Sequence, residues 1–319
     1  MKMIKYITKL LVASLLLSLC ISCDDDKSDF EFHAPIPLGD PFILLHDGTY
    51  YAYGTSSPDG IVVFTSDDLK LWKQQTELAL HKDNSWGNQW FWAPEVYYIE
   101  SEKKFYMYYS VEERIAVATS DSPLGPFVQE AKAPLLSEGS IDASLFIDDD
   151  GQAYLFYNKF NWGNVIWVAK LNDDLQTLDL NTQTECIRVS QEWEREAGLV
   201  NEGAFVIKHN GLYYLTYSAN DYRSHNYGIG YATATSPMGP WTKYEGNPIL
   251  QQPSDLKGVG HSAMFSDKQD NLRIVFHAHF DATQVLPRFM HIANVSFTND
   301  NPAIMTISEK YETPRLTYK

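Results

Sequence analysis

The 319-residue chain has few thiols. Of its three cysteines, Cys20 and Cys23 lie close to the N-terminus. Only Cys186 remains in the body of the chain, so internal disulfides cannot staple the fold, which must rest on its own packing. No histidine or second cysteine lies near Cys186 in the sequence, and we therefore expect its side chain to pack in the core.

Positive charge is also in short supply. Lysine and arginine number 25 against 41 aspartate and glutamate residues, which gives a formal net charge of -16. Binding to nucleic acid requires a positive surface that faces the phosphates, so no nucleic acid partner is expected. A neutral ligand such as a sugar is compatible with this charge, although acidity alone selects no function. Hydrophobic residues make up 44% of the chain, which predicts an ordered domain with a large core.

Several signatures of common enzyme classes are missing. The sequence has no His-Glu-x-x-His motif, no Gly-rich phosphate loop and no Gly-x-Ser-x-Gly elbow. The Trp-x-Asn-Asp-Pro-Asn motif of fructan-cleaving hydrolases is absent as well. No stretch has a long helical period, and we expect helix only in short turns such as residues 191–197. Strands are therefore the expected structural elements.

The N-terminus has the pattern of an export signal. A basic start precedes an apolar run over residues 10–21, which is too short to span a bilayer as a mature helix. A small residue directly before Cys23 resembles a bacterial lipobox. We predict a lipoprotein signal peptide over residues 1–22, acylation of Cys23 and a lipid anchor in the outer membrane, with an ordinary signal peptide as the alternative. Residues 23–33 are expected to form an acidic tether, followed by one monomeric catalytic domain over residues 34–319.

One pattern repeats along the rest of the chain. An apolar run that starts at Asn201 turns at Asn210-Gly211 and returns as a tyrosine-rich run. Asn-Gly between two apolar runs is a strong hairpin signal. A third short apolar run follows each hairpin. The pattern occurs five times, and each copy opens on an ionisable residue: Asp40, Glu95, Asp142, Glu202 and His261.

Repeats of several strands at this spacing predict a β-propeller. We predict an all-β fold, a five-bladed β-propeller with four-stranded antiparallel blades around a central channel. A β-sandwich is the rival fold, because alternating strands alone do not exclude it. A sandwich does not explain why every repeat opens on a polar residue. In a propeller, the innermost strands line the channel, so the five ionisable side chains would converge there. A single carboxylate could merely cap a turn.

Converging carboxylates suit the cleavage of glycosidic bonds. One protonated carboxyl group donates its proton to the leaving oxygen, and one ionised carboxylate takes a proton from the attacking water. The acid needs a raised pKa, which burial and a neighbouring negative charge provide. Asp40, Asp142 and Glu202 are the candidates for these three roles.

Four motifs, taken in order, strengthen this interpretation. They are Asp40-Pro41, Trp92-Ala93-Pro94-Glu95, Ser140-Ile141-Asp142-Ala143 and Asn201-Glu202-Gly203. The series resembles glycoside hydrolase family 43 over nearly the whole mature chain. Members of that family are inverting hydrolases of arabinose- and xylose-containing polysaccharides, and the resemblance implies the release of α-L-arabinofuranosyl or β-D-xylosyl units. It makes Asp40 the general base, Glu202 the general acid, and Asp142 the residue that raises the pKa of Glu202 and holds it in place.

The resemblance also implies two further residues. His261 matches a histidine near the channel centre that in many members helps to hold a hydrated calcium or other ion, and a buried structural histidine is the alternative. Arg288 begins the last strand, where we expect it against the terminal sugar, and an exposed arginine at a strand end is the alternative. The chemistry itself is expected to need no cofactor.

Aromatic residues before the second repeat are candidates for sugar stacking. We expect Trp92 at the pocket and at least one of Trp86, Trp90 and Phe91 in the packing between blades. Glu95 is expected to accept a hydrogen bond from a sugar hydroxyl or to support the site without a catalytic role. The polar and aromatic loops at residues 158–162 and 222–227 are candidate walls of the substrate site.

Two other functions remain open at this point. An endo-acting arabinanase would use the same acids, because the shape of the loops decides between chain ends and chain middles. A non-catalytic, glycan-binding propeller at the cell surface would bind pentosans without cleaving them. The three intact acids argue against this second alternative.

Overall fold

A computed structural model of the protein describes residues 33–317. The predicted signal peptide, the cysteine predicted to be acylated and almost the whole of the predicted tether lie outside these residues. Within residues 33–317, no helix is long and apolar enough to cross a membrane. The described helices are two short 3₁₀ turns, η1 (Lys82–Asn84) and η2 (Glu192–Arg195). The second of these lies in the stretch where the sequence predicts a helical turn.

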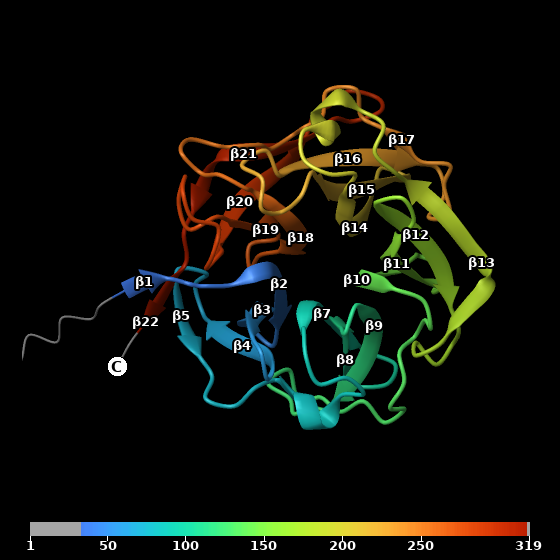
Figure 1. The fold of residues 1–319 in the computed structure, drawn as a ribbon, viewed down its shortest axis with the longest axis vertical. Helices are drawn as coiled ribbons and strands as arrows, with labels where there is room; N and C mark the ends of the chain where they lie inside the picture. The colour runs from blue at the N-terminus through green and yellow to red at the C-terminus, as the bar shows by residue number, and fades with distance from the viewer. Residues whose placement is uncertain (1–32, 318–319) are drawn as a thin grey trace, which may run out of the picture. The chain divides into compact units, whose positions relative to one another are not determined.

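Five sheets surround a central channel in a β-propeller arrangement (Figure 1). Each sheet begins with an innermost strand, and each innermost strand contacts the next one around the ring. The innermost strands are β2 (Gly39–His46), β7 (Trp92–Ile99), β10 (Ser140–Ile147), β14 (Asn201–His209) and β18 (Gly260–Ser266). The sandwich alternative is therefore wrong.

Each innermost strand pairs with the next strand of the chain in an antiparallel hairpin. The second strands are β3 (Thr49–Ser57), β8 (Lys104–Val111), β11 (Ala153–Phe160), β15 (Leu212–Ala219) and β19 (Leu272–Ala278). The third strands are β4 (Gly60–Ser66), β9 (Arg114–Ser120), β12 (Asn164–Leu171), β16 (Gly228–Ala234) and β20 (Phe289–Phe297). All five predicted hairpins and their third strands are thus confirmed.

The outer strands depart from the predicted uniform pattern. Three sheets have four strands, one has three and the first has seven. The fourth strands are β5 (Leu71–Gln74), β13 (Leu178–Ile187), β17 (Thr242–Lys243) and β21 (Met305–Glu312). After β9 the chain makes only an isolated bridge between Thr119 and Val128. Pro123, Pro126 and Pro134 follow β9 and have no N–H to donate to a fourth strand.

The first sheet is larger because both ends of the described chain add to it. β22 (Arg315–Thr317) pairs in parallel with β5, and β1 (His33–Pro35) pairs with β22. The short strand β6 (Leu80–His81) pairs with β4. The first and last sheets are also joined by the hydrogen bond from Met290 N to Ile36 O, at 3.1 Å. The ring is therefore closed by strands and hydrogen bonds.

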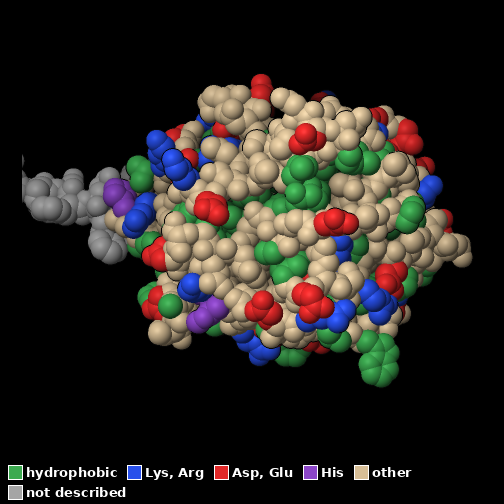
Figure 2. Space-filling model, turned by 90° about the horizontal axis from the view of Figure 1, so that it is seen from above, with side chains coloured by type: hydrophobic (Ala, Val, Ile, Leu, Met, Phe, Trp, Pro, Cys, Tyr) green, Lys and Arg blue, Asp and Glu red, His purple; other side chains and the backbone are tan. Residues whose placement is uncertain are grey.

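The core lies between neighbouring sheets and is rich in aromatic residues. Tyr53, Tyr108, Tyr157 and Tyr217, each on a second strand, are completely buried. Cys186 packs against one of the core clusters, as its sequence surroundings predict. On the face drawn in Figure 2, acidic and basic side chains are interspersed, and no continuous basic patch is seen there.

Candidate active site

The channel-facing end of every innermost strand contains the same irregularity. The register of each hairpin shifts just after the strand begins, in all five sheets. At each shift, one residue has a positive φ between 43° and 59°. These residues are Asp40, Ala93, Asp142, Gly203 and His261. A bulge of this kind re-aims a side chain next to a functional site. A non-glycine residue in this region carries strain that the surrounding fold must hold in place.

Side chains from the preceding sheet hold four of these bulges. The backbone N–H of Ala93 donates to Thr55 Oγ1 at 3.0 Å, and that of Asp142 donates to Ser110 Oγ at 2.9 Å. The N–H of His261 donates to Ser218 Oγ at 2.7 Å. The ring closes in the same way, because Asp40 N donates to His277 Nδ1 at 3.1 Å.

The fifth bulge is held by a catalytic candidate. The backbone N–H of Gly203 donates to the carboxylate of Asp142. Each innermost strand is thus fixed against its neighbour at the level of the site, which sets the relative positions of the candidate acids.

The bulges correct the predicted alignment of the five ionisable residues. Asp40, Asp142 and His261 do occupy the same bulge position. Glu202 stands one residue before its bulge, at the level of Trp92, because Glu202 pairs with Ser218 as Trp92 pairs with Ser110. Glu95 lies two residues beyond its own bulge, which places it about 7 Å further along the strand. The five residues therefore face the channel at three different levels.

Asp40 is held as an anion. Arg288 binds it with two hydrogen bonds, Nη1 to Oδ1 at 2.6 Å and Nη2 to Oδ2 at 2.9 Å. Thr55 Oγ1 donates to Oδ2 at 2.7 Å, and His261 Nδ1 lies 3.3 Å from Oδ1. Burial alone would raise the pKa of Asp40, but the neighbouring Arg288, His261 and His277 outweigh it and hold the pKa well below its usual range. An ionised Asp40 can accept a proton.

Glu202 has the opposite character. Its carboxyl group is nearly buried and receives hydrogen bonds from Asn164 Nδ2 to Oε2 at 2.8 Å and from Tyr227 OH to Oε1 at 2.9 Å. Burial raises the pKa of Glu202 to about 7 despite these two donors, and the charge of Asp40 adds to the rise. A carboxyl group with this pKa can carry and release a proton near neutral pH.

Asp142 lies close enough to Glu202 and Asp40 for their charges to shift its pKa. Burial raises the pKa of Asp142, and the charges of Glu202 and Asp40 raise it further. Asp142 and Glu202 form a coupled pair whose titration belongs to both groups, because one negative charge resists the second. That Asp142 raises the pKa of Glu202 and holds it in place stays a prediction.

A buried network positions the strand that carries Glu202. Glu194 of η2 accepts hydrogen bonds from Tyr217 OH at 2.7 Å and from Lys243 Nζ at 2.5 Å. Lys243 Nζ also donates to Asn201 Oδ1 at 2.8 Å. Asn158 Nδ2 donates to Asn201 O at 2.6 Å. The residue directly before Glu202 is thus fixed from both sides.

The predicted substrate residues are divided between the pocket and the interior. A cavity of about 930 Å³ is lined by Thr55, Trp90, Trp92 and Arg288, among others. Thr55 and Arg288 both bind Asp40, so this cavity adjoins the candidate base. The Trp90 and Trp92 rings stack at 6.1 Å. Phe91 is buried and packs against Tyr109 in the core, as one member of this aromatic run was expected to do.

Arg288 and Glu95 differ from their simplest expectations. Arg288 precedes β20, which is the third of four strands in its sheet and not the last. Its side chain is 10% exposed, so it is not a free arginine at a strand end. Glu95 accepts hydrogen bonds from Tyr97 and Ser144, and burial raises its pKa to about 8. These partners favour a supporting role for Glu95.

The surroundings of His261 do not make a calcium site of their own. Among residues 33–317, no group of three or more His, Cys, Asp or Glu side chains is placed to hold a metal ion. Ca²⁺ prefers six to eight oxygen ligands, whereas His261 offers a nitrogen beside an aspartate that Arg288 already neutralises. The calcium ion near His261 stays a prediction.

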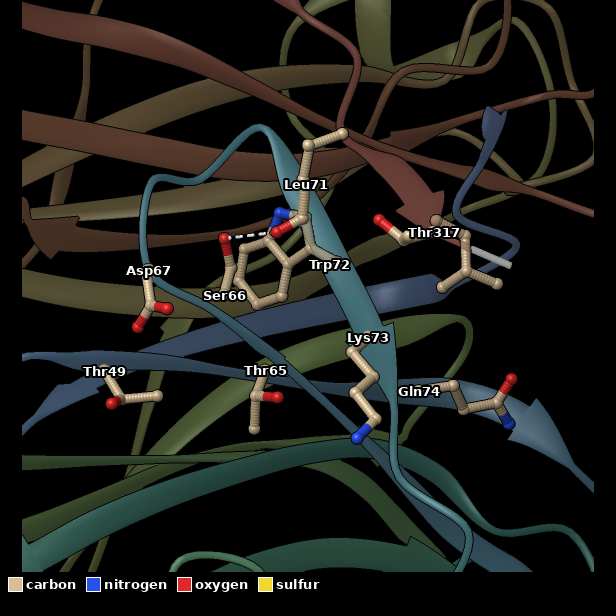
Figure 3. A pocket seen from close by; sticks show the side chains of 10 residues that line it. Thr49, Thr65, Ser66, Asp67, Leu71, Trp72, Lys73, Gln74 and Thr317 are labelled. Carbon is tan, nitrogen blue, oxygen red and sulfur yellow. Dashed lines mark hydrogen bonds between the residues drawn. The ribbon is translucent and has the colours of Figure 1, made fainter. Parts of the chain in front are cut away.

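A second cavity lies away from these residues. This cavity, of about 540 Å³, lies at the outer edge of the first sheet and is lined by residues of β4 and β5 and by the end of β22 (Figure 3). Ser66 Oγ donates to Leu71 O across it at 2.7 Å. None of the candidate acids lines this cavity, so it belongs to the closure of the ring and not to the active site.

Comparison with known proteins identifies the family of the chain. The model of glycosyl hydrolases family 43 matches residues 34–302. The chain belongs to glycosyl hydrolase family 43. It is therefore a glycoside hydrolase. This conclusion disfavours the non-catalytic glycan-binding alternative.

Individual relatives match over most of their own length. The structure of an endo-1,4-beta-xylanase from Bacteroides thetaiotaomicron superposes with a TM-score of 0.87 at 46% identity, covering 90% of this chain and 100% of that one. The beta-D-galactofuranosidase xynD of Aspergillus niger is 29% identical, covering 76% of this chain and 74% of the relative. A xylosidase/arabinosidase of Bacteroides ovatus is 26% identical, covering 66% of this chain and 77% of the relative.

Removing the hydroxyl group of Tyr227, which binds Glu202, tests whether Glu202 sets the pH profile of this family 43 enzyme. A hydrogen bond donated to an ionised carboxylate lowers its pKa, so Tyr227→Phe should raise the pKa of Glu202. If the protonated acid is the active form, activity is lost as pH rises through this pKa. The basic limb of kcat/KM should therefore move to higher pH, by roughly one unit.

The measurement is kcat/KM against pH for the wild type and for Tyr227→Phe. The phenylalanine keeps the ring that stacks on His277 at 5.7 Å. Tyr213→Phe is the matched control, because its hydroxyl binds the remote carboxylate Asp148 at 2.5 Å. A basic limb that stays in place, or moves to lower pH, contradicts the assignment of Glu202 as the acid.

Proposed function

We propose that the protein is an inverting glycosidase that releases pentose units, α-L-arabinofuranosyl or β-D-xylosyl, from plant hemicellulose or pectin side chains. Counting one blade for each sheet makes the catalytic domain a five-bladed propeller, with the acids at its hub. The observation that carries the proposal is the contrast between an ionised Asp40 and a Glu202 with a pKa of about 7 on the same channel.

In this proposal each acid has one task. Asp40 removes a proton from the water that attacks the anomeric carbon, and Glu202 donates its proton to the leaving oxygen. Asp142 is the ionised member of the pair, and its charge keeps the proton on Glu202 because a second anion nearby is disfavoured. Asn164 and Tyr227 fix both oxygens of Glu202, so the acid meets the bond in one orientation.

Arg288 tunes the base. Its two hydrogen bonds make Asp40 an anion, but they also make it a weak base. We infer that hydroxyl groups of the bound sugar take over part of these donors, since Arg288 also lines the cavity beside Asp40. Asp40 then becomes more basic only when substrate is bound, so part of the binding energy of the substrate serves to activate the base.

The names of the relatives guide the choice of substrate. The relative from Bacteroides ovatus is named for xylose and arabinose release, which favours a terminal pentosidase. The structural neighbour from Bacteroides thetaiotaomicron is titled an endo-1,4-beta-xylanase, and the xylan backbone is therefore the second candidate substrate. An arabinanase remains a third possibility, because a structure titled endo-arabinase shares the fold at 24% identity.

One assay panel tests the proposal. The purified protein is incubated with aryl α-L-arabinofuranoside, aryl β-D-xyloside, linear arabinan and xylan, and the released sugars are separated and identified. Free arabinose or xylose from at least one substrate is the expected product. Short oligosaccharides without free pentose would show that the enzyme cleaves inside the chain and not at its end. The absence of product from all four substrates would reject the proposed function.

We also propose that the protein is exported and anchored to the outer membrane through a lipid on Cys23. The support is the basic start, the apolar run over residues 10–21 and the small residue before Cys23. Mass spectrometry of the mature N-terminus tests this, since a chain that begins at Cys23 with added acyl groups is expected. A mature chain with an unmodified N-terminus would reject it.

A further inference from the structure

The hairpin tip between β11 and β12 exposes a tryptophan next to the site. Trp162 is 91% exposed, more than any other large hydrophobic side chain of the described residues. Phe160 on the same hairpin is 47% exposed, and Leu199, which lies against the tip, is 55% exposed. Exposed large apolar side chains on and beside one hairpin tip point to a binding surface. Phe160, Trp162 and Leu199 are called the Trp162 platform below.

The hairpin tip is built as a fixed structure. Asn161 N donates to Gly163 O at 2.9 Å, and Asn164 N donates to Leu199 O at 2.9 Å. Gly163 has φ +120°, and a Cβ at this position would lie 2.1 Å from Leu199 O. Only glycine allows this close approach. The tip is thus pinned to the segment that leads into β14.

The same contacts tie the platform to the general acid. Asn164, which begins β12, donates to Glu202 Oε2 at 2.8 Å. Trp162 stands two residues before Asn164, so their Cα atoms lie within about 7 Å of each other. Leu199, which accepts the hydrogen bond from Asn164 N, precedes Glu202 by three residues in the same segment. The platform and the acid therefore belong to one rigid unit.

The role of the acid decides which part of a substrate meets the platform. A general acid protonates the leaving oxygen, so it stands on the leaving-group side of the bond that is cleaved. The 930 Å³ cavity lies elsewhere, beside the base Asp40 and its partners Thr55 and Arg288. A substrate that spans both acids would therefore extend past Glu202 toward Trp162.

The chemistry of the platform fits a neutral sugar chain. Aromatic rings stack on the apolar faces of sugar rings. The cation on the hairpin, Lys159, is paired with Glu138 at 2.7 Å, so its charge is balanced. We propose that the Trp162 platform binds the sugar units on the leaving-group side of the scissile bond. The enzyme then favours an oligomeric or polymeric pentosan over a small glycoside.

This inference rests on the proposed function and is tested by a ratio of substrates. The ratio is kcat/KM for a pentosan, arabinoxylan or linear arabinan, divided by kcat/KM for the aryl pentoside. Trp162→Ala should lower this ratio by roughly 3- to 10-fold, the range of one lost aromatic contact. Trp162→Phe should restore most of it. Leu180→Ala, which removes a side chain 56% exposed on the outer strand β13, is the matched control and should leave the ratio unchanged.

Binding is measured separately, so that the two ideas can fail independently. Affinity electrophoresis in gels that contain arabinoxylan or arabinan compares Glu202→Gln with Glu202→Gln/Trp162→Ala. Weaker retardation of the double variant is expected. An unchanged ratio together with equal retardation overturns the platform, even if the enzyme releases pentose. Retardation that depends on Trp162 in a protein without pentosidase activity keeps the platform and rejects the proposed function.

Discussion

Asp40→Asn should reduce kcat/KM by roughly 10²- to 10⁴-fold on every substrate, whatever its leaving group. The amide cannot take a proton from water. Because the loss of the base slows the attack of water on every substrate, the leaving group should not change the size of the effect. The change also leaves the buried guanidinium of Arg288 without its anionic partner, which costs stability. We therefore expect the melting temperature to fall by several degrees, while the near-ultraviolet circular dichroism of the folded protein at 25 °C stays the same.

Asp267→Asn provides the control for that loss of stability. Asp267 is 3% exposed and pairs with Arg273 at 3.4 Å, so it is a second buried aspartate with an arginine partner, outside the site. This variant should also melt earlier, yet keep its kcat/KM. If Asp40→Asn retained more than a tenth of the wild-type activity, Asp40 would not be the base.

Glu202→Gln should show a loss that depends on the leaving group. With the poor leaving group of a natural glycosidic bond, the expected loss is roughly 10²- to 10⁴-fold. With a 2,4-dinitrophenyl pentoside the leaving oxygen needs little protonation, so the loss should shrink to about tenfold or less. The basic limb of the pH profile, set by the pKa of about 7 of Glu202 in the wild type, should disappear.

The measurement is a series of aryl pentosides of decreasing leaving-group pKa, assayed with Glu202→Gln and with Asp40→Asn. Glu138→Gln is the control for a removed surface carboxylate, because Glu138 forms its ion pair with Lys159 and is half exposed. A steeper dependence on the leaving group for Glu202→Gln than for Asp40→Asn is expected. Equal slopes for the two variants would mean that the roles of base and acid are wrongly divided.

The hairpins could be predicted because their signals are local. Turns such as Asn210-Gly211 stand between apolar runs, and the structure places β14 and β15 on either side of that turn. The convergence of Asp40, Asp142 and Glu202 followed from the propeller arrangement, which brings the start of every innermost strand to one channel. Local pattern and fold symmetry together were sufficient for this part.

The partners of the acids could not be predicted, because they come from other strands and sheets. His277 reaches Asp40 from another sheet, and Tyr227 reaches Glu202 from the loop before β16, across distances in sequence that no local pattern spans. One signal does exist in retrospect. Thr55, Ser110, Ser218 and His277 occupy matching positions near the ends of the second strands, and all are small hydroxyl residues or histidine.

The alignment of Glu95 with the other acids was wrong for a related reason. A bulge adds a residue to one strand and changes the level at which every later side chain stands. The bulges at Ala93 and Gly203 carry no ionisable side chain, so the sequence pattern shifted to the nearest acid, Glu95 or Glu202. The missing fourth strand after β9 is explained by the prolines that follow it, because they have no N–H to donate to a neighbouring strand.

The stereochemistry of the first product tests the central claim most directly. Proton NMR can follow the anomeric signals during the hydrolysis of an aryl pentoside, before mutarotation mixes the anomers. If Asp40 activates water on one side of the sugar while Glu202 protonates the oxygen on the other, the first sugar released must have inverted configuration. A first product with the configuration of the substrate would contradict the account, because it requires a covalent intermediate that this division of roles does not provide.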